Sequence, residues 1–87
     1  MSKSNTATGT TIELRYPLEH GETPIRELTI RRPKVGDLLA AKKTTGGDAE
    51  QEIAMFASLT GVAPAVLREL DMADYGELQQ VYQAFLS

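Results

Sequence analysis

The sequence predicts an α+β fold in which an N-terminal two-stranded β-hairpin is followed by about four short α-helices. Apolar residues alternate with polar ones along two early segments, and their spacing becomes helical after Pro33. With 87 residues and no cysteine, the chain forms one small domain that relies on packing or oligomerisation for stability. We expect a disordered tail at 1–10 and a single domain at 11–87, with the hairpin at 11–32 and the helical part at 33–87.

Two alternating segments predict the hairpin, with strands at about 11–16 and 25–31. The residues between them include Gly21 and polar side chains, as a connecting loop does. Pro17 and Pro33 each remove a backbone donor and limit the strands. Two strands alone are marginally stable in water, so we expect helices or a second copy to cover their apolar face. The residues of that face are Ile12, Leu14, Tyr16, Leu28 and Ile30.

Two helices are predicted in the middle of the chain, at about 33–43 and about 48–60. A flexible Thr-Thr-Gly-Gly sequence separates them. Asp48 and Gln51 have the spacing of a capping box at the start of the second helix. Gly61 follows this helix, where glycine commonly ends a helix in the left-handed conformation.

A short helix at 63–70 and a longer helix after Asp71 complete the predicted fold. Asp71 is expected to cap the last helix, and Asp74 adds negative charge at the positive end of its dipole. One apolar stripe runs along this helix to the C-terminus, and part of it serves either as core or as a surface for a partner helix. On the second reading, the partner-binding residues are Leu78, Val81, Tyr82, Phe85 and Leu86.

Charge is divided unevenly along the chain, although the net charge is only −3. Residues 1–43 carry eight basic and five acidic side chains, whereas residues 44–87 carry one basic and seven acidic side chains. Such polarity either steers copies of the chain head to tail or reflects ordinary solvated faces. On the first reading, the residues expected to mediate self-association are Arg31, Arg32, Lys34, Asp71 and Asp74.

The inventory of reactive side chains indicates that the protein is not an enzyme. His20 is the only histidine and falls in the predicted hairpin loop, where it is expected to be solvated. Asp71 and Asp74 have the spacing of paired carboxylates, but capping explains both. Neither metal-ligand spacing nor a phosphate-binding glycine loop is present, so we expect no catalytic residue, cofactor or metal. We also expect no membrane contact, since no apolar run approaches about 18 residues and residues 1–10 lack the apolar region of a signal peptide.

Nucleic-acid binding is an alternative from the residues alone. The sequence LTGVAPAVLREL imitates two helices joined by a glycine-containing turn, as in helix-turn-helix proteins. The second of these helices offers only Arg68 and Glu69 to base edges and lies in the acidic half of the chain, so we interpret it as core. The basic residues of the first half lack interleaved aromatic side chains for base stacking. We therefore expect no nucleic-acid partner.

The order of the motifs resembles that of a known family, the small tail-assembly chaperones of contractile-tailed (Mu-like and related) bacteriophages and prophages. The matching segments are IELRYPL, IRELTIRRPKVGDLLAAK and IAMFASLTGVAPAVLRELDMADYGELQQVYQAFL, which cover nearly all of residues 11–87. The most specific parts are LTIRRPKVGDL and LTG followed by VLRELDMADYGEL. They contain an Arg-Arg-Pro turn, a Gly-Asp pair and an Asp-Tyr pair in the order typical of the family.

The resemblance implies an assembly factor without catalytic activity. Such a chaperone binds the long helical tape measure protein and keeps it soluble in the cytoplasm of the bacterial host until tail tube protein polymerises around it. It is absent from the mature virion. The resemblance also implies a homo-oligomer, in many families joined by a longer form of the chain made by ribosomal frameshifting. A helix-turn-helix-like regulator and a structural tail component are the alternative functions.

Overall fold

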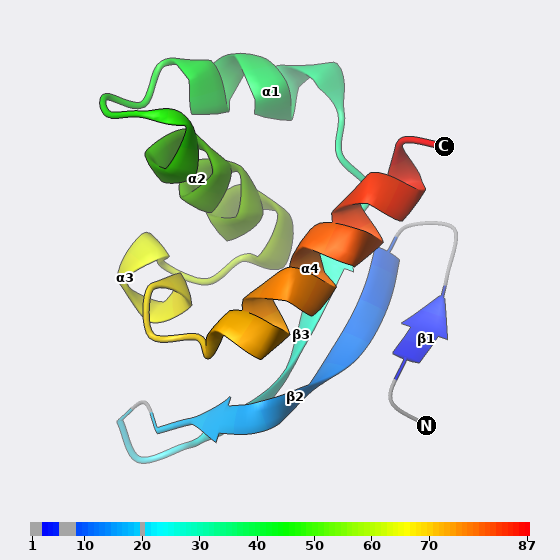
Figure 1. The fold of residues 1–87 in the computed structure, drawn as a ribbon, viewed down its shortest axis with the longest axis vertical. Helices are drawn as coiled ribbons and strands as arrows, with labels where there is room; N and C mark the ends of the chain where they lie inside the picture. Colours follow the sequence, from blue (N-terminus) through cyan, green and yellow to red (C-terminus); the bar gives the residue numbers. More distant parts are fainter. Residues whose placement is uncertain (1–2, 6–8, 20) are drawn as a thin grey trace.

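The computed structural model describes residues 3–5, 9–19 and 21–87. They form a three-stranded antiparallel sheet and four helices, two of which, α2 and α4, pack against the sheet (Figure 1). This arrangement confirms the predicted α+β class. The strands are β1 (Lys3–Asn5), β2 (Gly9–Leu18) and β3 (Ile25–Arg31), and the helices are α1 (Val35–Lys42), α2 (Asp48–Thr60), α3 (Pro64–Leu67) and α4 (Met72–Phe85).

The sheet has the order β1-β2-β3, so the predicted hairpin β2–β3 gains one strand. Lys3–Asn5 pairs with Thr10–Ile12. The sequence predicts that Lys3–Asn5 belongs to a disordered tail. The reason for the difference is that pairing along the edge of β2 uses backbone groups, which the polar composition of the tail does not reveal. Residues 1–2 and 6–8 of that tail lie outside the described residues, as does His20.

The start of β2 requires a glycine because the backbones of β2 and β3 approach closely there. A Cβ atom on Gly9 would lie 2.8 Å from the carbonyl oxygen of Ile30 on β3. Pairing then continues regularly, with Ile12 opposite Leu28, until the register shifts between Glu13 and Leu18.

This register shift corrects the prediction for Tyr16, whose side chain is 53% exposed instead of lying on the apolar face. An irregularity in one strand interrupts the period of two, so alternation read from the sequence assigns the wrong face beyond it. Leu18 is buried at the far end of the strand. The other four members of the predicted face, Ile12, Leu14, Leu28 and Ile30, are buried as expected.

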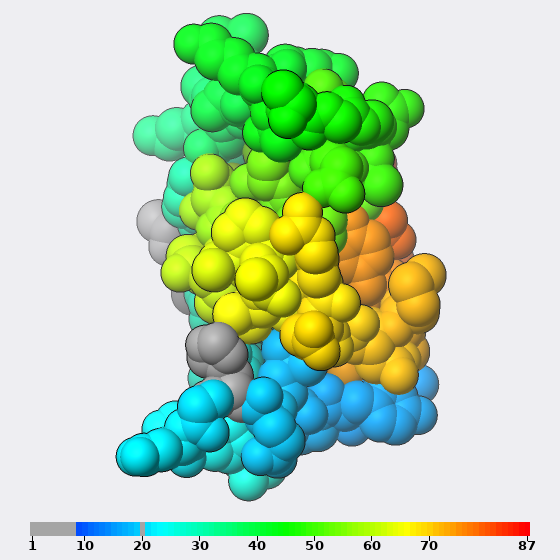
Figure 2. Space-filling view, turned by 90° about the vertical axis from the view of Figure 1, so that its left-hand side faces the viewer, coloured from blue at the N-terminus to red at the C-terminus, as the bar shows by residue number. Residues whose placement is uncertain are grey.

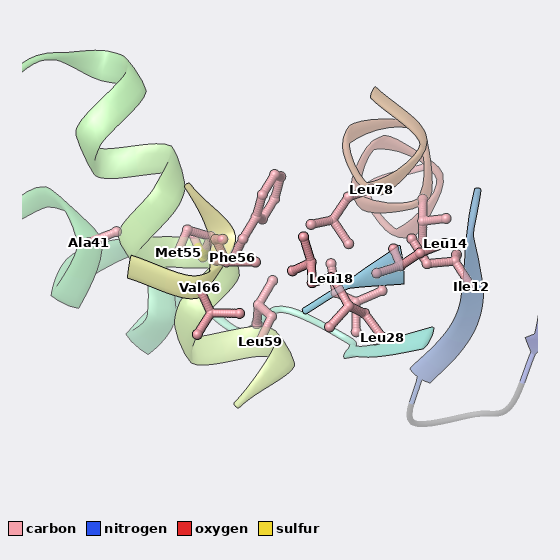
Figure 3. Packing of buried hydrophobic residues seen from close by; sticks show 13 residues of the cluster. Ile12, Leu14, Leu18, Leu28, Ala41, Met55, Phe56, Leu59, Val66 and Leu78 are labelled. Carbon is pink, nitrogen blue, oxygen red and sulfur yellow. The ribbon is translucent and has the colours of Figure 1, made fainter. Parts of the chain in front are cut away.

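The core lies between the sheet and the helices, where side chains of β2 and β3 meet those of α2 and α4 (Figure 3). Phe56 of α2 is fully buried, and Tyr75 and Tyr82 of α4 pack edge-on against its ring at centroid distances of 5.6 and 5.5 Å. Such edge-to-face contacts add about 0.5–1.5 kcal/mol each beyond the burial of area. The aromatic residues therefore fix α4 against α2.

The ends of the helices follow the predicted signals in two of three cases. Gly61 ends α2 in the left-handed conformation with φ 76°, and Asp71 caps α4 by accepting a hydrogen bond from the amide of Ala73. The predicted capping box at Asp48 is wrong, because Gly47 is the N-cap residue and Asp48 already lies in the first turn. An acidic residue in the first turn still favours the helix through its dipole.

Candidate partner-binding groove

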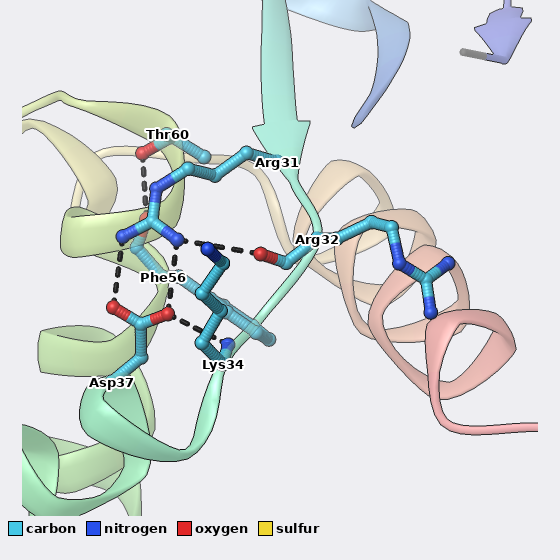
Figure 4. A network of polar contacts seen from close by, with 6 residues as sticks. All are labelled: Arg31, Arg32, Lys34, Asp37, Phe56 and Thr60. Carbon is cyan, nitrogen blue, oxygen red and sulfur yellow. Dashed lines mark hydrogen bonds and ion pairs between the residues drawn. The ribbon is translucent and has the colours of Figure 1, made fainter. Parts of the chain in front are cut away.

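Two consecutive arginines connect the sheet to the helices. Arg31, the last residue of β3, forms two hydrogen bonds with the carboxylate of Asp37, at 2.8 and 2.9 Å (Figure 4). The same carboxylate accepts the backbone amide of Lys34 at 2.8 Å, which satisfies a free donor at the start of α1. Asp37 therefore fixes the first turn of α1 to the end of β3.

The neighbouring Arg32 extends away from Arg31, toward the end of α4 (Figure 4). Its guanidinium lies 5.3 Å from the centre of the Phe85 ring, and it donates a hydrogen bond of 3.5 Å to the Phe85 carbonyl oxygen. A cation over an aromatic face contributes about 0.5–1 kcal/mol at an exposed site. The Arg-Arg-Pro turn thus contacts both α1 and α4.

A groove of about 300 Å³ opens between α1, α2 and α4. Among the described helices and strands, α1 packs on α2 alone. Helices α1 and α4 therefore stand apart, and the groove lies between them (Figure 1). Buried Met55 and Phe56 belong to its lining, together with the exposed Leu38. The complete lining is Leu38, Ala41, Lys42, Asp48, Gln51, Glu52, Met55, Phe56 and Tyr82.

Helix α1 presents apolar side chains to solvent beside this groove. Val35 is 73% exposed and Leu39 is 59% exposed, and Ala41 is the only buried residue of the helix. Leu86, at the end of α4, is also exposed. Large apolar side chains that stay exposed on a small domain can mark a contact with another protein.

A polar contact joins α2 to α4 next to the groove. Glu52 accepts hydrogen bonds from the hydroxyl of Tyr75 and, at 2.9 Å, from the amide of Gln79. Burial, and then the hydrogen bond to Glu52, raise the pKa of the Tyr75 hydroxyl well above its usual range. The hydroxyl therefore stays protonated at neutral pH and donates its hydrogen bond to Glu52.

The residues predicted to bind a partner divide into two groups in the structure. Leu78 and Val81 are buried in the core, since their face of α4 packs on the sheet, so for these two residues the structure favours the reading as core. Tyr82 and Phe85 are half-buried near the groove, and Leu86 is exposed. The sequence reading missed Val35, Leu38 and Leu39. The sequence shows the spacing of these residues on α1. It does not show that only one side of this helix is covered by the rest of the domain.

The residues predicted to mediate self-association are likewise divided. Arg31 pairs with Asp37 of its own chain, and the carboxylate of Asp74 is buried and accepts the amides of Arg15 and Tyr16, so neither is assigned to a contact between copies. Arg32, Lys34 and Asp71 are exposed, and the prediction stays open for them. Asp74 was read as a charge near a helix end because the sequence does not show which strand crosses that end.

Asp37 carries a testable pH dependence. The hydrogen bond from Arg31, followed by that from the Lys34 amide, lowers the pKa of Asp37 from 3.8 to about 2. A carboxyl group whose pKa is lower in the folded state stabilises the fold above its unfolded pKa, and this stabilisation is lost as the pH falls toward the folded pKa.

We therefore expect Asp37→Asn to lower the free energy of unfolding by about 0.5–1 kcal/mol at neutral pH, because it removes the charge that pairs with Arg31 and favours the start of α1, while the asparagine carbonyl can still accept the Lys34 amide. Urea unfolding of both proteins at several pH values measures the difference. It should be constant above about pH 4 and should close as the pH falls to about 2. A difference that persists unchanged at the lowest pH would contradict the assignment.

The helix α3, which belongs to the segment that imitates a helix-turn-helix, is part of the core. Its Val66 and Leu67 are buried, in agreement with the interpretation made from the sequence. In the described part of the chain, no group of three or more His, Cys, Asp or Glu side chains is placed to hold a metal ion. Within those same residues, no helix has the length and apolar character needed to cross a membrane.

The fold and the groove define a small α+β module with a surface suited to contact with another protein. Residues 11–87 match the family model described as "Phage tail assembly chaperone proteins, E, or 41 or 14". The chain therefore belongs to this family of phage tail assembly chaperones, as the resemblance of its motifs suggests. This is a family of chaperones, not of enzymes, and it implies protein partners in tail assembly. Neither a curated protein nor a solved structure matches the chain.

Proposed function

We propose that this chaperone binds the tape measure protein and keeps it soluble during tail assembly, and that the groove between α1 and α4 is the surface it uses. The observation that carries the proposal is an open groove on a domain whose family assembles phage tails. Apolar residues such as Met55 and Phe56 line the groove together with the polar residues Lys42, Asp48, Gln51 and Glu52. A helical partner with an apolar stripe would lay its large side chains into such a groove. Leu38, which lines the groove, is exposed, and Leu86 just beyond the end of α4 is a second exposed apolar side chain.

The physical need for a chaperone follows from the partner. A long helix with an uncovered apolar stripe aggregates unless that stripe is buried, and many copies of a small domain can bury it along its length. We propose that this happens in the cytoplasm of the bacterial host, by a homo-oligomer that includes a frameshifted longer form where one is made. On this proposal the chaperone leaves before the virion is complete, so mass spectrometry of purified tails should not detect it.

Co-expression with the tape measure protein encoded by the same phage or prophage tests the function. We expect the chain to raise the soluble fraction of the tape measure protein several-fold and to co-purify with it. Expression of the tape measure protein alone is the control. If the tape measure protein stays insoluble and the two do not co-purify, the proposal is wrong.

A further inference from the structure

A carboxylate in the groove has one oxygen occupied and the other without a partner. Glu52, on α2, is half-buried and lines the groove. Its Oε1 atom accepts both hydrogen bonds from α4, one from the Tyr75 hydroxyl and one, at 2.9 Å, from the side-chain amide of Gln79. Among the described residues no group donates to Oε2, and this atom is not fully buried. Helix α4 therefore fixes the carboxylate while one of its oxygens stays accessible to a partner.

The residues around Glu52 give the groove an acidic part and an apolar part. On α2, Asp48 lies four residues before Glu52, and Met55 and Phe56 lie three and four residues after it, so all four share one face of the helix and line the groove. Asp48 is exposed and forms no ion pair within the described part of the chain. Along about 12 Å of α2, two carboxylates are therefore followed by two large apolar side chains.

One cation also lines the groove. Lys42, the last residue of α1, is exposed, and among the described residues it pairs with neither carboxylate. The lining as a whole has a net charge of −1. Water screens the exposed ammonium group of Lys42 more than the half-buried carboxylate of Glu52, because a charge at an apolar wall is less hydrated. The groove therefore favours a cation over an anion.

We propose that the groove selects a helical segment of the partner in which a lysine or an arginine lies one turn from a large apolar residue. The apolar side chain contacts Met55 and Phe56, and the cation donates a hydrogen bond to Oε2 of Glu52. The spacing in the partner follows from the spacing on α2, since side chains three or four residues apart lie one turn apart on any α-helix. The inference rests on the proposed function and specifies which segments of the tape measure protein this surface binds.

The size and position of the groove suit anchoring side chains. Two turns of a helix about 10 Å wide fill roughly 850 Å³, so a groove of about 300 Å³ holds side chains and not the helix itself. Figure 2 shows the start of α2 and the loop before it, in green, at the upper end of the molecule. The acidic part of the groove therefore lies at the surface, where the charged end of a long basic side chain keeps part of its hydration while the stem contacts the apolar part.

Nuclear magnetic resonance of the full chain with isotopically labelled methionine methyl groups tests the selection. Of the three methionines, Met55 lines the groove, whereas Met72, at the start of α4, is 80% exposed and serves as the internal control. The probes are two synthetic peptides of about 18 residues, long enough to form a helix. Both carry the same stripe of leucines and differ only beside this stripe, where one has lysines and the other has glutamates.

We expect the lysine peptide to shift the Met55 methyl signal, to leave the Met72 signal unchanged and to bind at least about fivefold more tightly than the glutamate peptide. Higher salt should reduce the difference, because it screens the exposed part of the site. Equal affinity for the two peptides overturns the inference. A Met55 signal that moves with neither peptide overturns it as well.

Glu52→Gln tests the role of the unpaired oxygen. The glutamine carbonyl can still accept the hydrogen bonds from Tyr75 and Gln79, while Oε2 is replaced by an amide group that donates and no longer accepts. This variant should lose most of the preference for the lysine peptide and stay folded. Glu27→Gln is the matched control, since it removes the same charge at an exposed position on β3, which contributes no residue to the groove.

The control should keep the preference of the natural chain. A full preference in Glu52→Gln, or an equal loss in both variants, overturns the assignment to Glu52. The outcome is distinct from that of the proposed function. If co-expression makes the tape measure protein soluble but the two peptides bind equally, only the inference is wrong. If the lysine peptide is preferred but the tape measure protein stays insoluble, the proposed function is wrong and the groove still selects a cation.

Discussion

Asp74→Ala is expected to lower the free energy of unfolding by about 3 kcal/mol, which is a large fraction of the roughly 5–15 kcal/mol by which native proteins are stable. The carboxylate is 2% exposed and accepts the backbone amides of Arg15 at 2.8 Å and Tyr16 at 3.0 Å. These amides lie where the register of β2 and β3 shifts. Removing the carboxylate leaves two amides without their acceptor, and a buried donor without a partner costs about 1–3 kcal/mol.

Urea unfolding followed by circular dichroism measures this loss as a lower midpoint with an unchanged slope. Asp71→Ala is the matched control, because Asp71 is also an acidic residue at the start of α4 but is exposed and accepts one amide. Loss of such a cap costs about 1 kcal/mol. If the two variants lose equal stability, then Asp74 acts only as a charge at the helix end and does not hold β2.

Leu38→Glu combined with Leu86→Glu is expected to abolish the solubilisation of the tape measure protein while the domain stays folded. Both side chains are exposed, so the substitutions should change the free energy of unfolding by less than about 1 kcal/mol. A carboxylate placed in an apolar contact must lose its hydration when a partner binds. We expect the affinity to fall by about thirtyfold or more, as at other central contact residues.

Co-purification and the soluble fraction of the tape measure protein are the measurements. Tyr16→Glu with Ala65→Glu is the control, because it adds the same charge at exposed positions on β2 and α3, two elements that contribute no residue to the groove, whereas Leu38 lies on α1 and Leu86 follows α4, which both do. The control should bind as the natural chain does. Unchanged binding by the groove variant would show that the partner uses another surface, whereas loss of binding in both variants would point to net charge as the cause.

Local patterns in the sequence predicted much of this fold because they reflect local physics. Alternation placed Ile12, Leu28 and Ile30 in the core, and cap residues placed the end of α2 at Gly61 and the start of α4 at Asp71. The family was recognisable for a similar reason, since the Arg-Arg-Pro turn and the Asp-Tyr pair lie in continuous segments that the family model also matches.

The errors occur where distant parts of the chain meet. Tyr16 was assigned to the wrong face because the shift in register depends on pairing with β3 and on contact with α4. For Leu78 and Val81 the sequence left two readings open, because an apolar stripe has the same spacing whether the sheet or another protein covers it. Asp74 was interpreted as a charge at the end of the helix, because no local pattern in the sequence shows that β2 crosses that end.

The sequence by itself determined the class of fold, the order of the elements from β2 to α4 and the family, because period, caps and turns act over a few residues. Only the tertiary structure decided which apolar residues remain uncovered. Among the described helices and strands, α1 packs on α2 alone, and this arrangement opens the groove and exposes Val35 and Leu39. The tertiary structure likewise decided that Arg31 and Asp74 act within the chain, because their partners are set by how the sheet and helices pack. Burial is a property of the packed whole, so no local pattern contains it.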